Sequence, residues 1–305
     1  MFEGNNLMEL WLLYALGAAI FASLATILAK IGILNVDSHL ATAIRTLVVL
    51  VFAWLMVLVV GSLGDIRYIQ GRTWVFLVLS GLATGASWLC FFRALQLGNV
   101  NKIIPIDKSS TILTMLLAFI ILNEPIGWIT VISMVLMGIG TWLMLELKKE
   151  NKEENSSDGE HIKKPNTWLL YAVLAAVFAS LVAIIGRVGV VDIEANLWTA
   201  IRTIVVVPLS WLMVFIVGSQ KKIKLIERKS WLFLILSGIA TGASWLFFYH
   251  ALQIGIASLV IPIDKLSIVF TMGFARLVLG ERFSKRSIFG LGLLTLGTLI
   301  LVFIR

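Results

Sequence analysis

The sequence predicts an all-α membrane protein whose ten transmembrane helices form two inverted five-helix repeats. Its 305 residues are 59% hydrophobic and only 14% charged, with a mean hydropathy of +0.98. Soluble domains carry about 45–50% apolar and about 25% charged residues, so the composition excludes a soluble globular protein. The apolar residues run the whole length of the chain, which also excludes a soluble enzyme held by a single anchor.

Ten apolar runs are each long enough to cross a membrane as a helix, which takes about 20 residues. Short polar breaks separate the runs, and they do not alternate as the strands of an outer-membrane barrel would. The expected helices cover residues 11–31, 40–60, 74–95, 102–122, 126–145, 168–188, 197–217, 231–252, 259–279 and 287–304. The segment before the first run has no Lys or Arg, so we expect this run to be retained rather than cleaved as a signal peptide.

A shift of 157 residues lays the chain on itself without a gap, with roughly 60 identical positions over residues 11–145. The division is a first repeat at 1–145, a charged flexible linker at 146–166 and a second repeat at 167–305. Five spans are an odd number, so the second copy must enter the membrane from the opposite side. This is the inverted plan of many secondary transporters, with a site between the halves and a rocking motion that opens it alternately.

Loop charges favour one orientation of this plan. The second-copy loops QKKIKLIERKS and ERFSKRS carry five and three Lys/Arg, whereas their first-copy equivalents carry two and none. Basic residues collect in cytoplasmic loops. We therefore expect the linker and the basic loops inside, with both termini outside.

These features resemble the EamA domains of the drug/metabolite transporter superfamily. Each repeat ends its fourth helix in a Leu-x-Glu turn, Leu122-Asn-Glu124 and Leu279-Gly-Glu281, and carries Pro-x-Asp-Lys within that helix. The small-residue stretch from Gly81 to Trp88 is also similar to short bacterial and archaeal members with five helices. The chain looks like two such members fused, although its halves are more alike than usual and its loop charges disagree with the cytoplasmic termini usual in ten-helix members. The resemblance implies a transporter of small metabolites, often an exporter.

Two aspartates are the leading candidates for a transport role, because an ionisable group costs roughly 2.5–3.5 kcal/mol inside a membrane. Asp107 and Asp264 lie at equivalent positions, about one third of the way into the fourth helices. Pro105 and Pro262 precede them by two residues, and a proline can loosen a helix and free its carbonyls. We expect the aspartates to carry protons or bind a substrate amine. The alternative is that a nearby Lys or Arg neutralises them and they only join helices.

Lys108 and Lys265 adjoin these aspartates, but neighbours on a helix point about 100° apart. One member of each pair could therefore face a cavity while the other pairs with a second helix. Arg45 and Arg202, in the second helices, are the natural partners. The arginines also have a simpler interpretation, as structural ion pairs or as residues whose charge reaches the interface.

The third helices supply a possible cavity wall. Ser87-Trp88 and Ser244-Trp245 occupy equivalent positions, and these tryptophans lie too deep for an interfacial belt. We expect the tryptophans to form a wall or stacking surface. The small residues around them favour close helix packing instead.

Four further ionisable residues lie near the ends of expected helices. Arg93 and His250 are equivalent, and His250 is either a one-sided proton sensor or an interfacial residue. Glu124 and Glu281 stand in turns at the membrane edge, where we expect each to cap the next helix.

Cations outnumber carboxylates within the expected spans, which favours carboxylate-bearing or zwitterionic substrates over lipophilic cations. The first span also lacks the membrane-embedded Glu of the small multidrug resistance pumps, so multidrug efflux is less favoured. The groups counted are Lys30, Arg45, Arg93, Lys108, Arg187, Arg202 and Lys265 against Asp107 and Asp264.

Nothing in the sequence indicates enzyme chemistry. There is no GxxxxGK phosphate loop, so nucleotide-driven pumping is not expected. The single Cys90 excludes a multi-thiolate site, and no residues have metal-ligand spacing, so neither metal nor cofactor is expected. The net charge of +8 is explained by cytoplasmic loops rather than by a nucleic-acid partner.

The sequence thus predicts a secondary active transporter of small polar metabolites, amino-acid-like or carboxylate-bearing, with proton-linked export by alternating access. We expect it in a prokaryotic inner membrane, with the substrate and the lipid bilayer as partners, working as a monomer or homodimer. The alternatives are a flippase for a lipid or lipid-linked carrier, multidrug efflux and a non-transporting scaffold. Paired intramembrane charges that recur in both repeats argue against the scaffold.

Overall fold

The computed structural model describes residues 3–123, 126–145, 167–189, 193–254, 260, 263–264 and 266–303, and these form helices without a strand. The first half holds α1 (Glu3–Ile33), α2 (Ser38–Val60), η1 (Ser62–Tyr68), α3 (Gly71–Leu97), α4 (Val100–Lys108), α5 (Ser110–Leu122) and α6 (Trp128–Met144). The second half holds α7 (Thr167–Gly189), α8 (Ala195–Val217), η2 (Ser219–Leu225), α9 (Arg228–Ile254), α11 (Ser267–Val278) and α12 (Lys285–Phe303).

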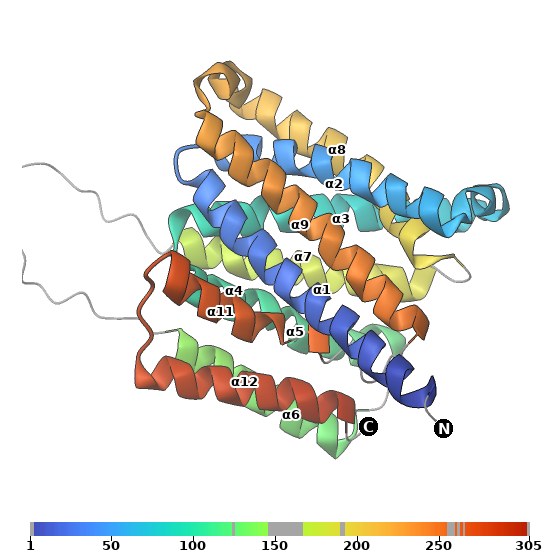
Figure 1. The fold of residues 1–305 in the computed structure, drawn as a ribbon, viewed down its shortest axis with the longest axis vertical. Coiled ribbons are helices and arrows are strands. Elements are labelled where there is room, and N and C mark those ends of the chain that lie inside the picture. Colours follow the sequence, from blue (N-terminus) through green and yellow to red (C-terminus); the bar gives the residue numbers. More distant parts are fainter. Residues whose placement is uncertain are drawn as a thin grey trace, which may run out of the picture.

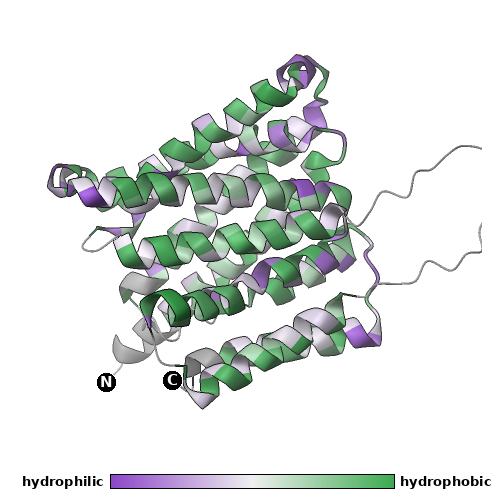
Figure 2. Cartoon of the chain, turned by 180° about the vertical axis from the view of Figure 1, so that it is seen from behind, coloured by the Kyte–Doolittle hydropathy of each residue, from purple (hydrophilic) through white to green (hydrophobic). Residues whose placement is uncertain are grey.

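The chain is an integral membrane protein that crosses the bilayer several times. Among the described residues, seven stretches are long and apolar enough to span it: Leu10–Ile33, Ser38–Val60, Gly71–Leu97, Val100–Leu122, Thr167–Gly186, Ala195–Val217 and Arg228–Phe248. Helices α6 and α11 are also apolar but shorter. Hydrophobic residues cover the bodies of the helices and hydrophilic residues gather at their ends (Figure 2). An all-α membrane fold is therefore confirmed, while the full set of ten spans stays a prediction.

The two halves interleave instead of forming separate lobes (Figure 1). The most extensive helix contacts join α1 to α9, α3 to α7, α6 to α12 and α2 to α8, and each pair takes one helix from each half. Exchanging the halves turns the α1–α9 pair into the α7–α3 pair, so the contacts follow the sequence repeat. A rocking motion of two self-contained halves, as the sequence suggested, does not fit this packing.

The bundle has two ends, named here by the chain segments found there. At the terminal end, where α1 begins and α12 ends, η1 meets the start of α8, and Ser62 Oγ donates to Glu194 at 3.0 Å (Figure 1). At the linker end, where α6 ends and α7 begins, η2 and the turn after α1 enclose a small cavity of about 130 Å³.

Helices α2 and α8 begin and end by the same devices in both halves. The Asp37 carboxylate accepts backbone hydrogen bonds from His39 and Leu40, and Glu194 does the same for the start of α8. At the far ends Gly61 and Gly218 have φ of +80° and +76°, a left-handed conformation that glycine adopts without strain. These caps fix where the helices carrying Arg45 and Arg202 start and stop.

The fourth helix of the first half spans Val100–Leu122, close to the predicted 102–122, with a single turn residue, Ser109, that divides it into α4 and α5. Helix α4 ends at Lys108 and α5 starts at Ser110. The Ser109 hydroxyl donates to the Ile106 carbonyl at 2.6 Å, a local bond that competes with the helical ladder. Pro105 lies inside α4, and its carbonyl accepts from the Ser109 amide at 2.9 Å.

Candidate functional site

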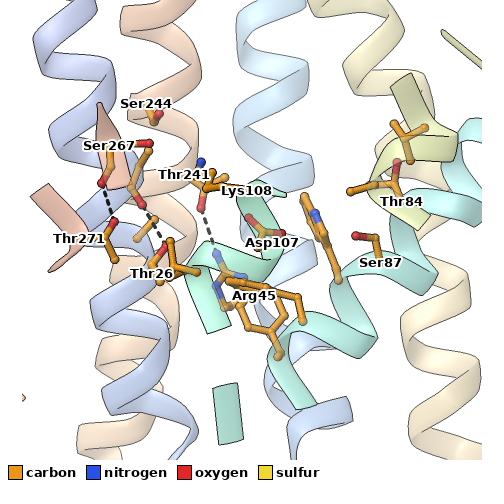
Figure 3. Close-up of a pocket in the computed structure, with 18 of the residues that line it drawn as sticks. Thr26, Arg45, Thr84, Ser87, Asp107, Lys108, Thr241, Ser244, Ser267 and Thr271 are labelled. Carbon is orange, nitrogen blue, oxygen red and sulfur yellow. Dashed lines mark hydrogen bonds between the residues drawn. The ribbon is translucent and has the colours of Figure 1, made fainter. Parts of the chain in front are cut away.

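A cavity of about 410 Å³ lies inside the bundle, and both halves form its wall (Figure 3). Its lining combines charged groups, hydroxyls and aromatic rings. The residues are Ala22, Ala25, Thr26, Arg45, Thr84, Ser87, Trp88, Phe91, Phe92, Ile104, Asp107, Lys108, Ala179, Val182, Arg202, Thr241, Ser244, Trp245, Ser267 and Thr271.

Four charged side chains are among the described residues of this lining. Arg45, Arg202 and Lys108 are cationic, and Asp107 is the carboxylate. Asp107 and Lys108 come from the last turn of α4, directly before the turn residue Ser109. Positive charge therefore exceeds negative charge within the cavity itself.

Arg45 is anchored across the interface between the halves. Its Nε donates to Ser237 Oγ at 2.8 Å and its Nη2 donates to Thr241 Oγ1 at 3.0 Å. Because both acceptors are on α9, the guanidinium points toward that helix (Figure 3). The guanidinium carbon also lies 4.2 Å from the centroid of the Phe92 ring, within cation–π range. Only 5% of the residue is exposed, so hydroxyls and a ring face, rather than a described carboxylate, hold this buried cation.

The equivalent Arg202 has a different neighbour. Its guanidinium carbon lies 4.8 Å from the centroid of the Trp198 ring. The same indole packs against Gly186, where an added Cβ would come within 2.8 Å of the Trp198 ring. The first half has Ala41 and Ala29 at these positions. Tryptophan and glycine thus form a complementary pair that exists only in the second half.

The paired serines serve helix packing as well as the cavity wall. Ser87 Oγ donates to the Ala175 carbonyl and Ser244 Oγ donates to the Ala18 carbonyl, both at 2.9 Å. These equivalent bonds join α3 to α7 and α9 to α1. Their hydroxyl protons are committed to helix contacts, which leaves the oxygen lone pairs to face the cavity.

Sequence-predicted residues that the structure brings together are Arg45, Ser87, Trp88, Asp107, Lys108, Arg202, Ser244 and Trp245. Asp264 is half-buried and lies outside this lining. Pro262, Lys265 and the Arg187 side chain fall outside the described residues. His250 packs edge-on against the Tyr14 ring, with 4.3 Å between the ring centroids.

Two cations counted for the cavity lie elsewhere. Lys30 Nζ binds the carbonyls of Leu95 and Gly98 at the linker end. Arg93 Nη1 donates to Gln96 Oε1 at 2.6 Å. Both cations bond to acceptors near the end of α3. This place is closer to the membrane interface than the cavity is.

The sequence reasoning missed several hydroxyl groups in the wall. Thr26, Ser267 and Thr271 line the cavity, and Ser237 anchors Arg45 from behind it. A weak signal was present: Ser237 and Thr241 stand four residues apart and so share one face of α9. Their tie to Arg45 could not be read from the sequence, because it depends on how the halves interleave.

The fold and this site define a class: a multi-pass helical membrane protein whose bundle encloses a largely apolar cavity with charged and hydroxyl groups in its wall, as in membrane transporters. The model of the EamA-like transporter family matches residues 9–146 and 166–303, so the chain belongs to that family and carries its domain twice. Among the described residues, no group of three or more His, Cys, Asp or Glu could hold a metal ion.

Two individual proteins are similar to this chain. The "Uncharacterized transporter in cobO 3'region" of Sinorhizobium sp is 42% identical over 134 residues, which is 95% of its length but 44% of this chain. It thus corresponds to a single repeat. A solved structure described only as "Crystal structure of protein" has a TM-score of 0.64 at 15% identity over 96% of both chains, a likeness that shows the fold alone.

Proposed function

We propose that the protein is a secondary active transporter of small polar metabolites that carry a carboxylate, amino-acid-like molecules among them, and that it exports them by proton-linked alternating access. The central cavity is the observation that carries this proposal. Its volume of about 410 Å³ is within the usual range of small-molecule sites, roughly 300–1,000 Å³. Family membership supports transport but leaves the substrate open.

The chemistry of the cavity supports a substrate that has both a carboxylate and an apolar or amine part. Arg45, Arg202 and Lys108 supply positive charge for a carboxylate, and guanidinium groups match its two oxygens. Asp107 offers a counter-charge for an amine or a carrier for a proton. The rings of Trp88 and Trp245 provide apolar faces between these groups.

Alternating access is supported by the repeat. The contacts of α1 with α9 recur as those of α7 with α3, which supports a two-fold relation between equivalent helices around the cavity. In Figure 1 α1 runs from the terminal end to the linker end, and α7 runs the opposite way, as an inverted arrangement requires. The moving units in this proposal are groups of helices drawn from both halves.

Transport in proteoliposomes tests the proposal. The purified protein should take up or release a labelled amino acid or organic acid faster under a pH gradient than without one. The variant Asp107→Asn with Asp264→Asn should lose the gradient effect while it still folds. A double variant that transports as the wild type does contradicts the proton-carrier role, and transport of fluorescent lipids alone would favour a flippase.

We further propose that the linker end faces the cytoplasm of a prokaryotic cell. The basic side chains of η2 and of the α11–α12 turn support this orientation through the positive-inside tendency. Single cysteines placed in the 146–166 linker should then resist an impermeant maleimide added outside intact cells. Ready labelling from outside would reverse the orientation.

A further inference from the structure

The glutamate of the second Leu-x-Glu turn has no part in the cavity, yet it joins the two halves. Glu281 accepts backbone hydrogen bonds from Val100 at 2.8 Å and from Asn101 at 2.9 Å, one on each carboxylate oxygen. These N–H groups open α4. Glu281 therefore caps a helix of the opposite repeat, whereas the sequence suggested the next helix, α12.

A cation holds the other side of the same turn. Lys30 Nζ donates to the carbonyls of Leu95 and Gly98, at 2.5 and 2.6 Å, where α3 ends. An anion at a helix N-terminus and a cation at a helix C-terminus are each the favourable partner of the helix dipole. The turn at residues 95–101 is thus clamped at both ends.

This clamp bears on the cavity through α4. The helix that Glu281 caps ends, two turns later, in Asp107 and Lys108. The turn before α4 is also closely packed, because a Cβ on Gly98 would come within 3.2 Å of the Trp168 ring. Movement of α4 at the linker end requires all of these contacts to loosen together.

A second observation shows that the two ends differ. The linker-end cavity of about 130 Å³ is lined by Val36, Lys222, Leu225 and Ile226, among others. A shift of 157 residues maps these four onto Ile193, Asp65, Tyr68 and Ile69. These equivalents line a cavity of about 590 Å³ at the terminal end. At the linker end, where the clamp is formed, the described residues of this place in the repeat line the smaller of the two cavities.

We propose that Lys30, Glu281 and the turn at residues 95–101 form a latch that keeps the linker end shut, and that Glu281 leaves α4 when this end opens. The inference rests on the alternating access proposed above and assigns the residues that control one of its two openings. The sequence repeats both latch charges, since Arg187 and Glu124 occupy the equivalent positions. Their side chains lie outside the described residues.

Cysteine labelling tests the latch. A reporter, Ala179→Cys in the cavity wall, is placed in a Cys90→Ala background and labelled from the linker side with an impermeant maleimide. Glu281→Gln keeps the size of the side chain but removes its charge and one acceptor, so labelling should be about tenfold faster or more. Glu227→Gln, which removes an exposed glutamate at the same end, should label as the parent protein does.

The outcomes separate the latch from the transport cycle. If Glu281→Gln transports substrate but its reporter is labelled no faster than in the parent, the latch is wrong and alternating access stands. A reporter that is never reached from either side, with or without substrate, contradicts the proposed function itself.

A cross-link keeps the proposal testable if Glu281→Gln fails to fold. The pair Asn101→Cys and Glu281→Cys, in the Cys90→Ala background, should form a disulfide that holds the linker end shut. Oxidation should stop transport and a reductant should restore it. Unchanged transport after complete cross-linking overturns the latch.

Discussion

Two equivalent serines give the sharpest test of the packing between the halves. Ser237 and Ser80 are both fully buried, at the same position of the third helix of their repeats. Ser237 Oγ accepts from Arg45 and donates to the Ala25 carbonyl, at 2.8 and 2.5 Å. Among the described residues, Ser80 Oγ has no hydrogen-bond partner. The same substitution at the two positions should therefore have different effects.

The size of the difference follows from the bonds that are lost. Ser237→Ala removes two hydrogen bonds, one of them to a buried cation. A hydrogen bond within a membrane protein contributes about 0.6 kcal/mol on average and up to about 1.7, and bonds to charged groups lie at the upper end. We expect Ser237→Ala to lower the free energy of unfolding by about 1–3 kcal/mol. Ser80→Ala should leave it unchanged or raise it slightly, because a buried hydroxyl without a partner is itself costly.

Reversible unfolding in mixed micelles, followed by circular dichroism, measures both variants under one condition. A double variant with Arg45→Met tests the mechanism, since the cost of Ser237→Ala should shrink once the guanidinium is gone. Equal losses for the two serine variants would show that burial alone, and not the Arg45 network, sets their contribution. The same conclusion would follow if Ser237→Ala lowered the free energy of unfolding by as much in the Arg45→Met background as in the wild type.

Three further outcomes follow from the site and its packing. Asp107→Asn should reduce pH-driven transport more than Asp264→Asn, because Asp107 lines the cavity and Asp264 does not; equal rates in proteoliposomes would contradict this. Gly186→Ala should raise the KM of transport several-fold by displacing Trp198 from Arg202, and adding Trp198→Ala should relieve the clash; a double variant worse than Gly186→Ala argues against this pairing. Gly140→Leu should lower the melting temperature in detergent, because its Cβ would lie 2.6 Å from backbone atoms of α12; an unchanged value would show that α6 and α12 can separate.

The sequence was sufficient for the fold class because its strongest signals are local. Apolar runs of spanning length predict membrane helices, and the exact recurrence of Thr-Ala-Ile-Arg-Thr and Pro-Ile-Asp-Lys predicts a duplicated unit. The fourth helix was predicted over 102–122 and is found over Val100–Leu122, but the turn at Ser109 within it was not foreseen. Pro105 indicates that the helix is weak there, but not the residue at which it is distorted.

The site was predicted in part, and the errors have a common cause. Arg45 and Asp107 were chosen because a buried charge is costly wherever it lies, and both reach the cavity. Lys30 was chosen by the same argument, yet its charge is absorbed by carbonyls at the end of α3. Residue type gives the cost of a buried charge but not the partner that offsets it. For Lys30 that partner is the end of another helix in the same half, and for Arg45 it is a pair of hydroxyls from the other half.

The interleaved packing explains how nearly identical repeats acquire unlike surroundings. Each arginine of the second helices packs against the third helix of the other repeat, so a change in either repeat alters a contact made by both. Trp198 and Gly186 replace a pair of alanines and give Arg202 a ring face, while Arg45 keeps hydroxyl partners on α9. The backbone around the two arginines is alike in both halves. Gly81 packs against the backbone carbonyl of Arg202, and Gly238 packs in the same way against the backbone carbonyl of Arg45. A duplicated scaffold of this kind preserves the helix contacts while the surroundings of its two cavity cations diverge.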